Sequence, residues 1–326
     1  RLLILGIGIG AIAGTVLSTW QPQTKTPNIA KNNQNTSLFN SKPLQSNMNG
    51  SNTPVIYENK SILKPTKKID ELKKPMEDLV KKNPKLKPGL FLIDLDTGAY
   101  FDYSGNASFS AASMIKVPIL LAFFQDVDAG KIKLNEELTL EKSIIAEGAG
   151  TIQYDKIGSK FTTLEVATKM MQISDNTATN MIIKRLGGQE KLNQRFKSWG
   201  LKTTVINNLL ADLEGTNLTT PKELVTVMGM INQGEKISSE SRDRILDIMQ
   251  KVKTNTLLPK GLEKNATIAH KTGDIRSVVG DVGLIDMPTG KRYMVCVIVK
   301  RSNNDPKAQE LIRQLSKTIY QHFKNN

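Results

Sequence analysis

Apolar residues change their spacing several times along the chain, and each change indicates an element. Helical spacing across residues 69–80 predicts a first helix. Two runs at 90–95 and 99–103 flank the turn letters DTG and predict a β-hairpin. A continuous apolar run at 117–124 then predicts a buried helix, with Ser113 in its first turn.

The middle of the chain, from residue 141 to about 250, reads as helices joined by loops. Residues 162–165 (TTLE) form a capping box ahead of an apolar run. Residues 220–223 (TPKE) give the strongest helix start, with a cap, a proline at the first position and a glutamate at the third. We therefore expect a mainly helical region here.

Strand signals return near the C-terminus. Residues 267–271, 278–285 and 293–299 predict three antiparallel strands, and apolar residues from 308 to 319 predict a closing helix. Strands at both ends with helices between them imply one antiparallel sheet built from the two chain ends, with an inserted helical domain. The expected fold is α/β, of the α+β type.

The domain limits follow from composition and pattern. We place the globular domain at residues 67–326, with its helical subdomain at about 130–266. Residues 21–66 are rich in Asn, Gln, Ser, Thr, Pro and Lys and have no apolar periodicity, so we expect a disordered polar linker.

The first twenty residues suggest membrane targeting. Residues 2–19 are uncharged, largely apolar and about long enough to cross a bilayer, and Trp20 follows where an interfacial aromatic belongs. We favour an uncleaved anchor over a signal peptide cut after residues 11–13. The domain is then expected outside the cytoplasm, in the periplasm or at the cell surface, either tethered or released by cleavage.

Charge and composition narrow the partners. The 326-residue chain carries a net charge of +14, which fits either attraction to polyanions or an ordinary lysine-rich surface. Aromatic residues make up 5%, without basic patches interleaved, so we expect no nucleic-acid partner. The single Cys296 lies in an apolar run and reads as a buried strand residue. His270 reads as packing, and no metal or other cofactor is expected.

Residues 113–116 (SMIK) are the first candidate for chemistry. Residues three apart share a helix face, so the Lys116 amine can reach the Ser113 hydroxyl. Unpaired N–H groups at a helix start suit a developing oxyanion, so the set could serve as an acyl-transfer nucleophile. Residues 61–64 (SILK) have the same spacing in a polar stretch, however, and a helix-capping serine is the alternative reading.

Two further motifs change that balance. Residues 174–176 (SDN) lie between two expected helices, and residues 271–273 (KTG) lie at the end of an expected strand; each triplet occurs once. In order and approximate spacing, the three motifs resemble those of the superfamily of class A serine β-lactamases and penicillin-binding proteins, from about residue 67 to the C-terminus. This resemblance implies a β-lactamase-like serine hydrolase that forms an acyl-enzyme.

The resemblance assigns catalytic roles that also make chemical sense. Ser113 is the nucleophile, and Lys116, kept neutral in a desolvated site by the nearby charge of Lys271, is the general base. Ser174 can relay a proton to the leaving nitrogen. These four side chains are the expected catalytic set.

Binding roles fall on the other motif residues. Asn176 can hydrogen-bond an amide of the substrate, and Lys271 with Thr272 can bind its carboxylate. A carboxylate is present in β-lactams and at the D-Ala-D-Ala end of cell-wall peptides. The resemblance puts the oxyanion hole at the backbone N–H groups of the nucleophile and of Asp274, just past Gly273.

One departure from the family pattern concerns deacylation. Class A β-lactamases carry an E-x-x-L-N loop whose glutamate activates the water that removes the acyl group. No such sequence occurs between residues 200 and 217, and a leucine falls where the glutamate belongs. Asp212 or Glu214 is a candidate replacement; otherwise both are ordinary loop carboxylates.

Three functions therefore remain open. The first is hydrolysis of β-lactams. The second is a D-Ala-D-Ala carboxypeptidase or esterase acting on cell-wall substrates, and the third is a β-lactam-binding sensor that deacylates slowly. In each case we expect a monomer that binds a small molecule, β-lactam or cell-wall peptide, and reaches the membrane through its N-terminal segment.

Overall fold

The structure is a computed structural model that describes residues 64–326. All described residues belong to one compact unit, Glu58–Asn326. The expected membrane segment and nearly all of the expected linker lie outside the described residues. Among residues 64–326, no helix combines the length and the apolar character needed to cross a bilayer.

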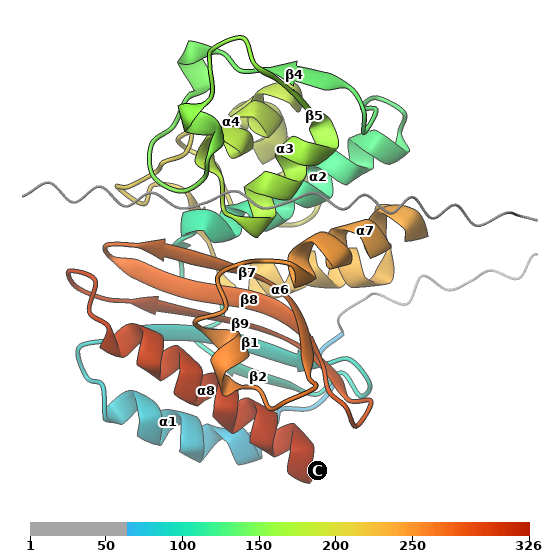
Figure 1. Ribbon diagram of the computed structural model, residues 1–326. Helices are drawn as coiled ribbons and strands as arrows, with labels where there is room; N and C mark the ends of the chain where they lie inside the picture. The colour runs from blue at the N-terminus through green and yellow to red at the C-terminus, as the bar shows by residue number, and fades with distance from the viewer. Residues whose placement is uncertain (1–63) are drawn as a thin grey trace, which may run out of the picture. The chain divides into compact units, whose positions relative to one another are not determined.

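A five-stranded antiparallel sheet lies at the centre of the fold (Figure 1). Its strand order is β2-β1-β9-β8-β7, so β1 from the start of the domain pairs directly with β9 from its end. This confirms the expected sheet built from both chain ends. The strands are β1 (Lys87–Asp94), β2 (Tyr100–Tyr103), β7 (Thr267–Ile275), β8 (Val278–Asp286) and β9 (Arg292–Lys300).

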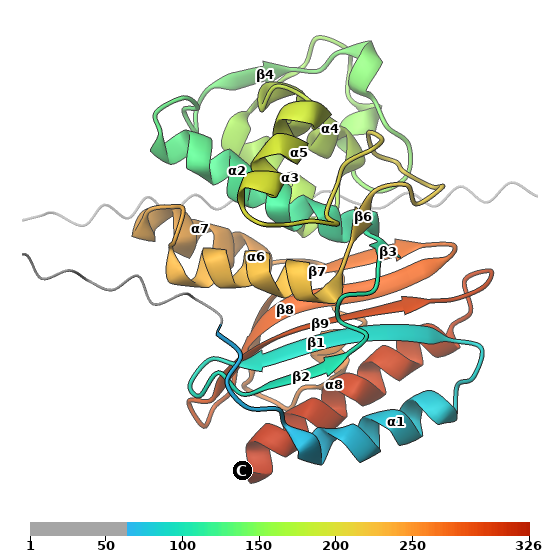
Figure 2. The same cartoon turned by 180° about the vertical axis from the view of Figure 1, so that it is seen from behind.

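Two terminal helices cover one face of the sheet (Figure 2). They are α1 (Lys73–Lys81), preceded by the 3-10 turn η1 (Asp70–Leu72), and α8 (Lys307–Asn325). Burial of their apolar stripes against the sheet stabilises this layer. Tyr293 of β9 stacks on Phe323 of α8, with ring centroids 4.6 Å apart. Another turn, η5 (Leu258–Gly261), packs on α8.

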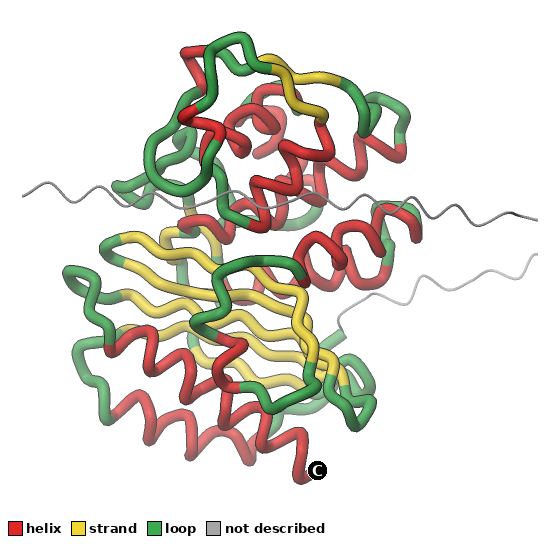
Figure 3. Tube along the Cα trace, viewed as in Figure 1, coloured by secondary structure: helices red, strands yellow, loops and turns green. Residues whose placement is uncertain are grey.

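The other face of the sheet carries the helical part (Figure 3). The apolar run that predicted a buried helix forms α2, which is buried on nearly every side. Four short strands form two separate ribbons, β3 with β6 and β4 with β5. The elements are β3 (Phe109–Ser110), α2 (Lys116–Asp128), β4 (Glu137–Thr139), β5 (Lys160–Thr162), α3 (Thr163–Gln172), α4 (Asn176–Arg185), α5 (Gln189–Ser198), β6 (Leu218–Thr219), α6 (Pro221–Gln233) and α7 (Ser239–Gln250), with the 3-10 turns η3 (Lys142–Ile144) and η4 (Ile152–Tyr154).

Local sequence signals place most helix starts correctly. Thr162 accepts a hydrogen bond from Glu165 N at 3.2 Å, and Thr220 accepts one from Glu223 N at 3.0 Å. One expected start differs. Ser113 does not lie in the first turn of α2, which begins at Lys116, but in the 3-10 turn η2 (Ala112–Ile115) that leads into it.

Candidate active site

Ser113 lies where the chain passes from the sheet layer into the helical part. Its neighbours Met114 and Ile115 are buried, whereas Ser113 itself is half-buried and can meet a substrate. The preceding Ala112 has a φ of +44°, a left-handed conformation that costs energy for a residue with a side chain. The surrounding packing holds this turn in place and fixes the direction of the serine hydroxyl.

Lys116 is fully buried and has four polar neighbours. Its Nζ donates to the Ser174 backbone oxygen at 2.7 Å and to Asn176 Oδ1 at 3.0 Å. It also lies 3.0 Å from the hydroxyl oxygens of Ser113 and Ser174. A neutral amine has two N–H donors, which the two carbonyl-type oxygens satisfy, and one lone pair. That lone pair is then free to accept a proton from a serine hydroxyl.

The electrostatic surroundings favour the neutral amine. Burial lowers the pKa of Lys116 well below its usual value, and the positive charge of Lys271 lowers it further. The Asp175 carboxylate opposes this shift more weakly. Lys116 is therefore equipped to act as the general base for Ser113.

The Ser174 loop is held by its central aspartate. Oδ1 of Asp175 accepts a hydrogen bond from Ala178 N at 2.8 Å and so caps α4. Oδ2 accepts from Thr151 N at 2.7 Å and Ile152 N at 2.9 Å, which ties down a second loop. Asp175 therefore has a structural role, and it positions Ser174 beside Lys116.

Asn176 connects the base to the rim of the site. Its Oδ1 accepts from Lys116, and its Nδ2 donates to the backbone oxygen of Glu147 at 3.0 Å. Contact with a substrate amide stays a prediction for this residue. The structure does bring Ser113, Lys116, Ser174 and Asn176 together, as the motifs predicted.

The third motif lies on β7, at the edge of the sheet. Lys271 is 1% exposed, and burial lowers its pKa to about 8, while the Asp281 carboxylate opposes the shift. Its Nζ donates to the Thr272 backbone oxygen at 2.9 Å. In neutral solution Lys271 is therefore mainly protonated, which suits an anionic substrate group.

Gly273 lets β7 approach the nucleophile turn. A Cβ at this position would lie 3.0 Å from the Ala112 Cβ and 3.2 Å from the Ala111 backbone oxygen. The strand and the turn that carries Ser113 are thus in direct contact. Asp274 follows immediately in β7, and the part of its backbone N–H in an oxyanion hole stays a prediction.

Neither candidate carboxylate for deacylation is bonded to the catalytic set. Asp212 is buried, and its oxygens accept hydrogen bonds from Thr216 N, Thr216 Oγ1 and Asn217 N at 2.7–3.0 Å, which closes the loop. Glu214 is exposed. Within the described part of the chain, no hydrogen bond joins either one to Ser113 or Lys116.

A leucine is fixed beside α4 in this loop. Leu210 is 7% exposed, its N–H donates to Asn180 Oδ1 at 2.9 Å, and its backbone oxygen accepts from Asn180 Nδ2 at 2.6 Å. Asn180 lies one helical turn beyond Asn176, so this apolar side chain is anchored close to the site. Asn180 was missed from the sequence, where its spacing of four from Asn176 was the only available signal.

The fold and the site define an acyl-transferring serine hydrolase. The family model described as "Beta-lactamase enzyme family" (Beta-lactamase2) matches residues 71–323. The chain belongs to this beta-lactamase enzyme family.

Similar proteins agree with this assignment. The solved structure of PBP-A is 54% identical, with a TM-score of 0.79 over 81% of this chain and 100% of that one. A PBP-A mutant, solved as an acyl-enzyme complex with penicillin G, is 53% identical with the same TM-score and coverage. A beta-lactamase of Bacillus licheniformis is 25% identical over 249 residues, which are 74% of this chain and 80% of that protein.

Metal binding has no support in the described part of the chain. Among residues 64–326, no group of three or more His, Cys, Asp or Glu side chains is arranged to hold a metal ion.

Proposed function

We propose that the enzyme opens the amide bond of β-lactams through an ester on Ser113 and that release of the acyl group limits its turnover. The observation that carries this proposal is the buried Lys116 amine, whose nitrogen lies 3.0 Å from the Ser113 hydroxyl oxygen. The acyl-enzyme of the PBP-A mutant with penicillin G, at 53% identity, supports the same substrate class.

Acylation follows from the positions of the side chains. Ser113 Oγ bonds to the carbonyl carbon while its proton passes to Lys116 Nζ. Negative charge on the carbonyl oxygen is stabilised by the backbone N–H groups of Ser113 and Asp274. The C–N bond then breaks, and the nitrogen takes a proton from the Ser174 hydroxyl, which regains one from Lys116 through their 3.0 Å contact.

Deacylation requires water to attack the ester, and the site offers little help. Leu210 occupies the region that would supply a carboxylate base, and Asp212 is engaged in its own loop. Lys116 is the remaining base near the ester. We therefore expect an acyl-enzyme that accumulates during turnover.

The test combines two substrates and one variant. A chromogenic cephalosporin reports turnover, and a fluorescent penicillin reports the covalent label. We expect rapid labelling at one site per molecule, slow steady turnover after a burst, and loss of both in Ser113→Ala. A fully labelled Ser113→Ala protein would refute the nucleophile, and absence of any label in the wild type would refute β-lactam chemistry.

A D-Ala-D-Ala carboxypeptidase is the second candidate. The departure from the E-x-x-L-N pattern of class A β-lactamases supports this candidate. Lys271 and Thr272 would hold the terminal carboxylate. Release of D-alanine from an acyl-D-Ala-D-Ala peptide, lost in Ser113→Ala, would support this function; a stable penicillin label without any hydrolysis would support a sensor.

We also propose that the enzyme is held outside the cytoplasm by residues 2–19. Their uncharged, apolar composition supports this. Membrane fractionation of cells that express the whole chain tests it: the protein should pellet with membranes and resist salt extraction. Recovery in the soluble fraction at its full length would contradict an anchor.

A further inference from the structure

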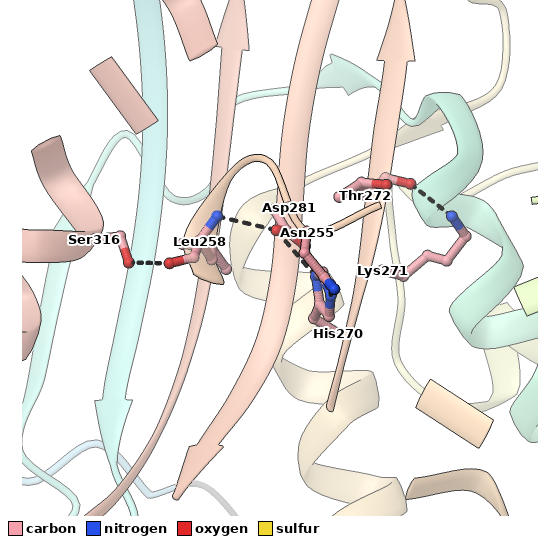
Figure 4. Close-up of polar contacts among 7 residues, drawn as sticks. All are labelled: Asn255, Leu258, His270, Lys271, Thr272, Asp281 and Ser316. Atoms are coloured by element: carbon pink, nitrogen blue, oxygen red, sulfur yellow. Dashed lines mark hydrogen bonds and ion pairs between the residues drawn. The ribbon is translucent and has the colours of Figure 1, made fainter. Parts of the chain in front are cut away.

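A buried polar cluster lies behind the active-site strand, outside the catalytic set (Figure 4). Its centre is His270 of β7 and Asp281 of β8, which are 1% and 0% exposed. His270 directly precedes Lys271, so their side chains point to opposite faces of the strand. The acylation steps described above make no use of this cluster.

Every polar atom of the pair has a partner. His270 Nδ1 lies 3.0 and 3.1 Å from the two Asp281 oxygens, and its Nε2 lies 3.2 Å from Asn255 Oδ1. Asp281 Oδ2 also accepts a hydrogen bond from Leu258 N at 3.2 Å. The Leu258 backbone oxygen in turn accepts from the Ser316 hydroxyl of α8 at 2.8 Å. The carboxylate is therefore fixed from β7, η5 and, indirectly, α8.

A buried carboxylate in this position has an electrostatic effect on the site. Asp281 lies opposite Thr272 in the strand register, next to the Lys271–Val282 pair. It is the negative group that opposes the lowering of the Lys271 pKa. Burial, and to a lesser extent the Asp281 charge, raises the pKa of the Cys296 thiol on the neighbouring strand β9, which stays neutral.

The site needs its two buried lysines in different states. Lys116 must be neutral to take a proton, while Lys271 must be charged to bind a substrate carboxylate and to keep Lys116 neutral. Burial acts on both amines in the same direction. The Asp281 carboxylate raises the pKa of Lys271 and is not among the charges that act on Lys116, so it separates the two amines.

We propose that Asp281, oriented by His270 and the Leu258 N–H, is a positioning residue that keeps Lys271 positively charged for recognition of the substrate carboxylate. This role rests on the proposed acylation of Ser113. It extends the active site to a pair of side chains that never touch the substrate.

The test uses the whole chain in detergent and the variant Asp281→Asn, which removes the charge and keeps the shape. The acylation rate constant with a fluorescent penicillin is measured against pH. Near pH 8, where Lys271 titrates, we expect about a tenfold loss relative to wild type. About two pH units lower, where Lys271 is protonated in both proteins, the rates should agree within about twofold.

A matched control separates this effect from general damage. Asp286→Asn removes the same charge from the same strand, where Asp286 pairs with Arg292 and is 35% exposed. Its pH profile should coincide with that of the wild type. Thermal unfolding checks that each variant is folded, and Asp281→Ser replaces Asp281→Asn if the latter does not fold.

The outcomes are distinct. A loss of rate that is equal at every pH would make Asp281 merely structural and overturn the inference while leaving the proposed function intact. A wild-type protein that is never labelled would overturn the proposed function and the inference with it. If the alkaline fall of the acylation rate constant moves to lower pH in Asp281→Asn and not in Asp286→Asn, the result supports the role of the His270–Asp281 pair.

Discussion

The two buried lysines of the active site have different surroundings, which give their amines different pKa values. Lys116 Nζ donates to the Ser174 backbone oxygen and to Asn176 Oδ1, and it lies 3.0 Å from the Ser113 hydroxyl oxygen. The Asp281 carboxylate raises the pKa of Lys271, so this amine keeps its positive charge in neutral solution. The motifs picked out both lysines, because each motif residue is identified by its immediate sequence neighbours, and their catalytic roles stay predictions.

Acylation should fall as the pH rises through about 8. Lys271 loses its charge there, so it binds the substrate carboxylate less well and depresses the Lys116 pKa less. The rate constant for penicillin labelling across the alkaline range measures this. In Lys271→Arg the guanidinium stays protonated, so the falling limb should move out of that range even if the rate is lower. If the rate constant of Lys271→Arg falls at the same pH as that of the wild type, another group causes the fall.

Asp212→Asn should lower stability and leave deacylation unchanged. The carboxylate accepts three hydrogen bonds from Thr216 and Asn217, and an amide would face one of those N–H donors with its own. We expect a loss of about 2 kcal/mol in the free energy of unfolding, measured with urea. Release of the penicillin label, measured per folded molecule, should match the wild type. A large fall in that rate would make Asp212 the deacylating base.

Pairs of residues that belong to none of the three motifs could not be predicted. Asn180 holds Leu210, thirty residues away, and His270 was interpreted as packing because its partner Asp281 lies on the next strand. The sequence shows each side chain but not the register that pairs them. The absence of the glutamate was visible from the sequence, whereas the way the loop is closed required the structure.

At the level of elements, the site depends on how closely β7 meets η2. Gly273 is the position that allows this approach, because its missing side chain leaves room for Ala112. The sequence pattern predicted a strand at residues 267–271 with the KTG motif at its end. The structure continues the strand to Ile275, so Gly273 and Asp274 still belong to β7.

Gly273→Ala should impair acylation more than folding. The added Cβ would meet the Ala112 Cβ at 3.0 Å and the Ala111 oxygen at 3.2 Å, so β7 and η2 must separate slightly. A misplacement of this kind costs roughly tenfold to a hundredfold in rate. Labelling kinetics measure the loss, and thermal unfolding serves as the control. An unchanged rate would mean that the strand has more freedom than the contact implies.

The sequence predicted where helices begin, but not all hydrogen bonds that the residues at these positions make. In α6, Glu223 does not complete the capping box by returning to Thr220. It accepts hydrogen bonds from the N–H groups of Lys202, Thr203 and Thr204, so it anchors the entry of the loop that holds Leu210. A local motif gave the helix boundary and left the long-range contact unseen.

Glu223→Ala should therefore lower the free energy of unfolding more than is usual for a half-buried side chain. Three backbone N–H groups lose a charged acceptor, and we expect about 2–3 kcal/mol less stability by urea unfolding. Glu165→Ala is the matched control, because Glu165 stands at the same position of α3 and pairs only loosely with Lys169 at 3.7 Å. Its cost should stay within about 0.5 kcal/mol. Equal costs for the two variants would contradict the anchoring role.

In the whole molecule, the sheet separates two apolar cores, and the site lies on the helical side. One core joins the sheet to α1 and α8, and the other joins it to α2 and the helical part. Every residue of the catalytic set lies between 113 and 274, within the described unit. The order of elements along the chain predicted the sheet built from both chain ends and the inserted helices, but not the division into two cores.

A chain that begins near residue 67 should label with penicillin at the rate of the full chain. The site contacts described above all join residues within 64–326. Parallel labelling of the two proteins in the same detergent measures the comparison. A truncated protein that folds but labels at least tenfold more slowly would show that the N-terminal segment takes part in the site.

The pairing of β1 with β9 also has a consequence for the time at which activity arises. Partners such as Leu90 and Val297 are roughly two hundred residues apart, so the central ladder is among the most non-local contacts a domain of this size can have. The loop between them must close before these hydrogen bonds form. Synthesis of β9 is therefore a precondition for the sheet, and the β7 edge that completes the site waits for it. If the chain is exported as an extended polymer, the hydrolase becomes competent only after almost its whole length has emerged.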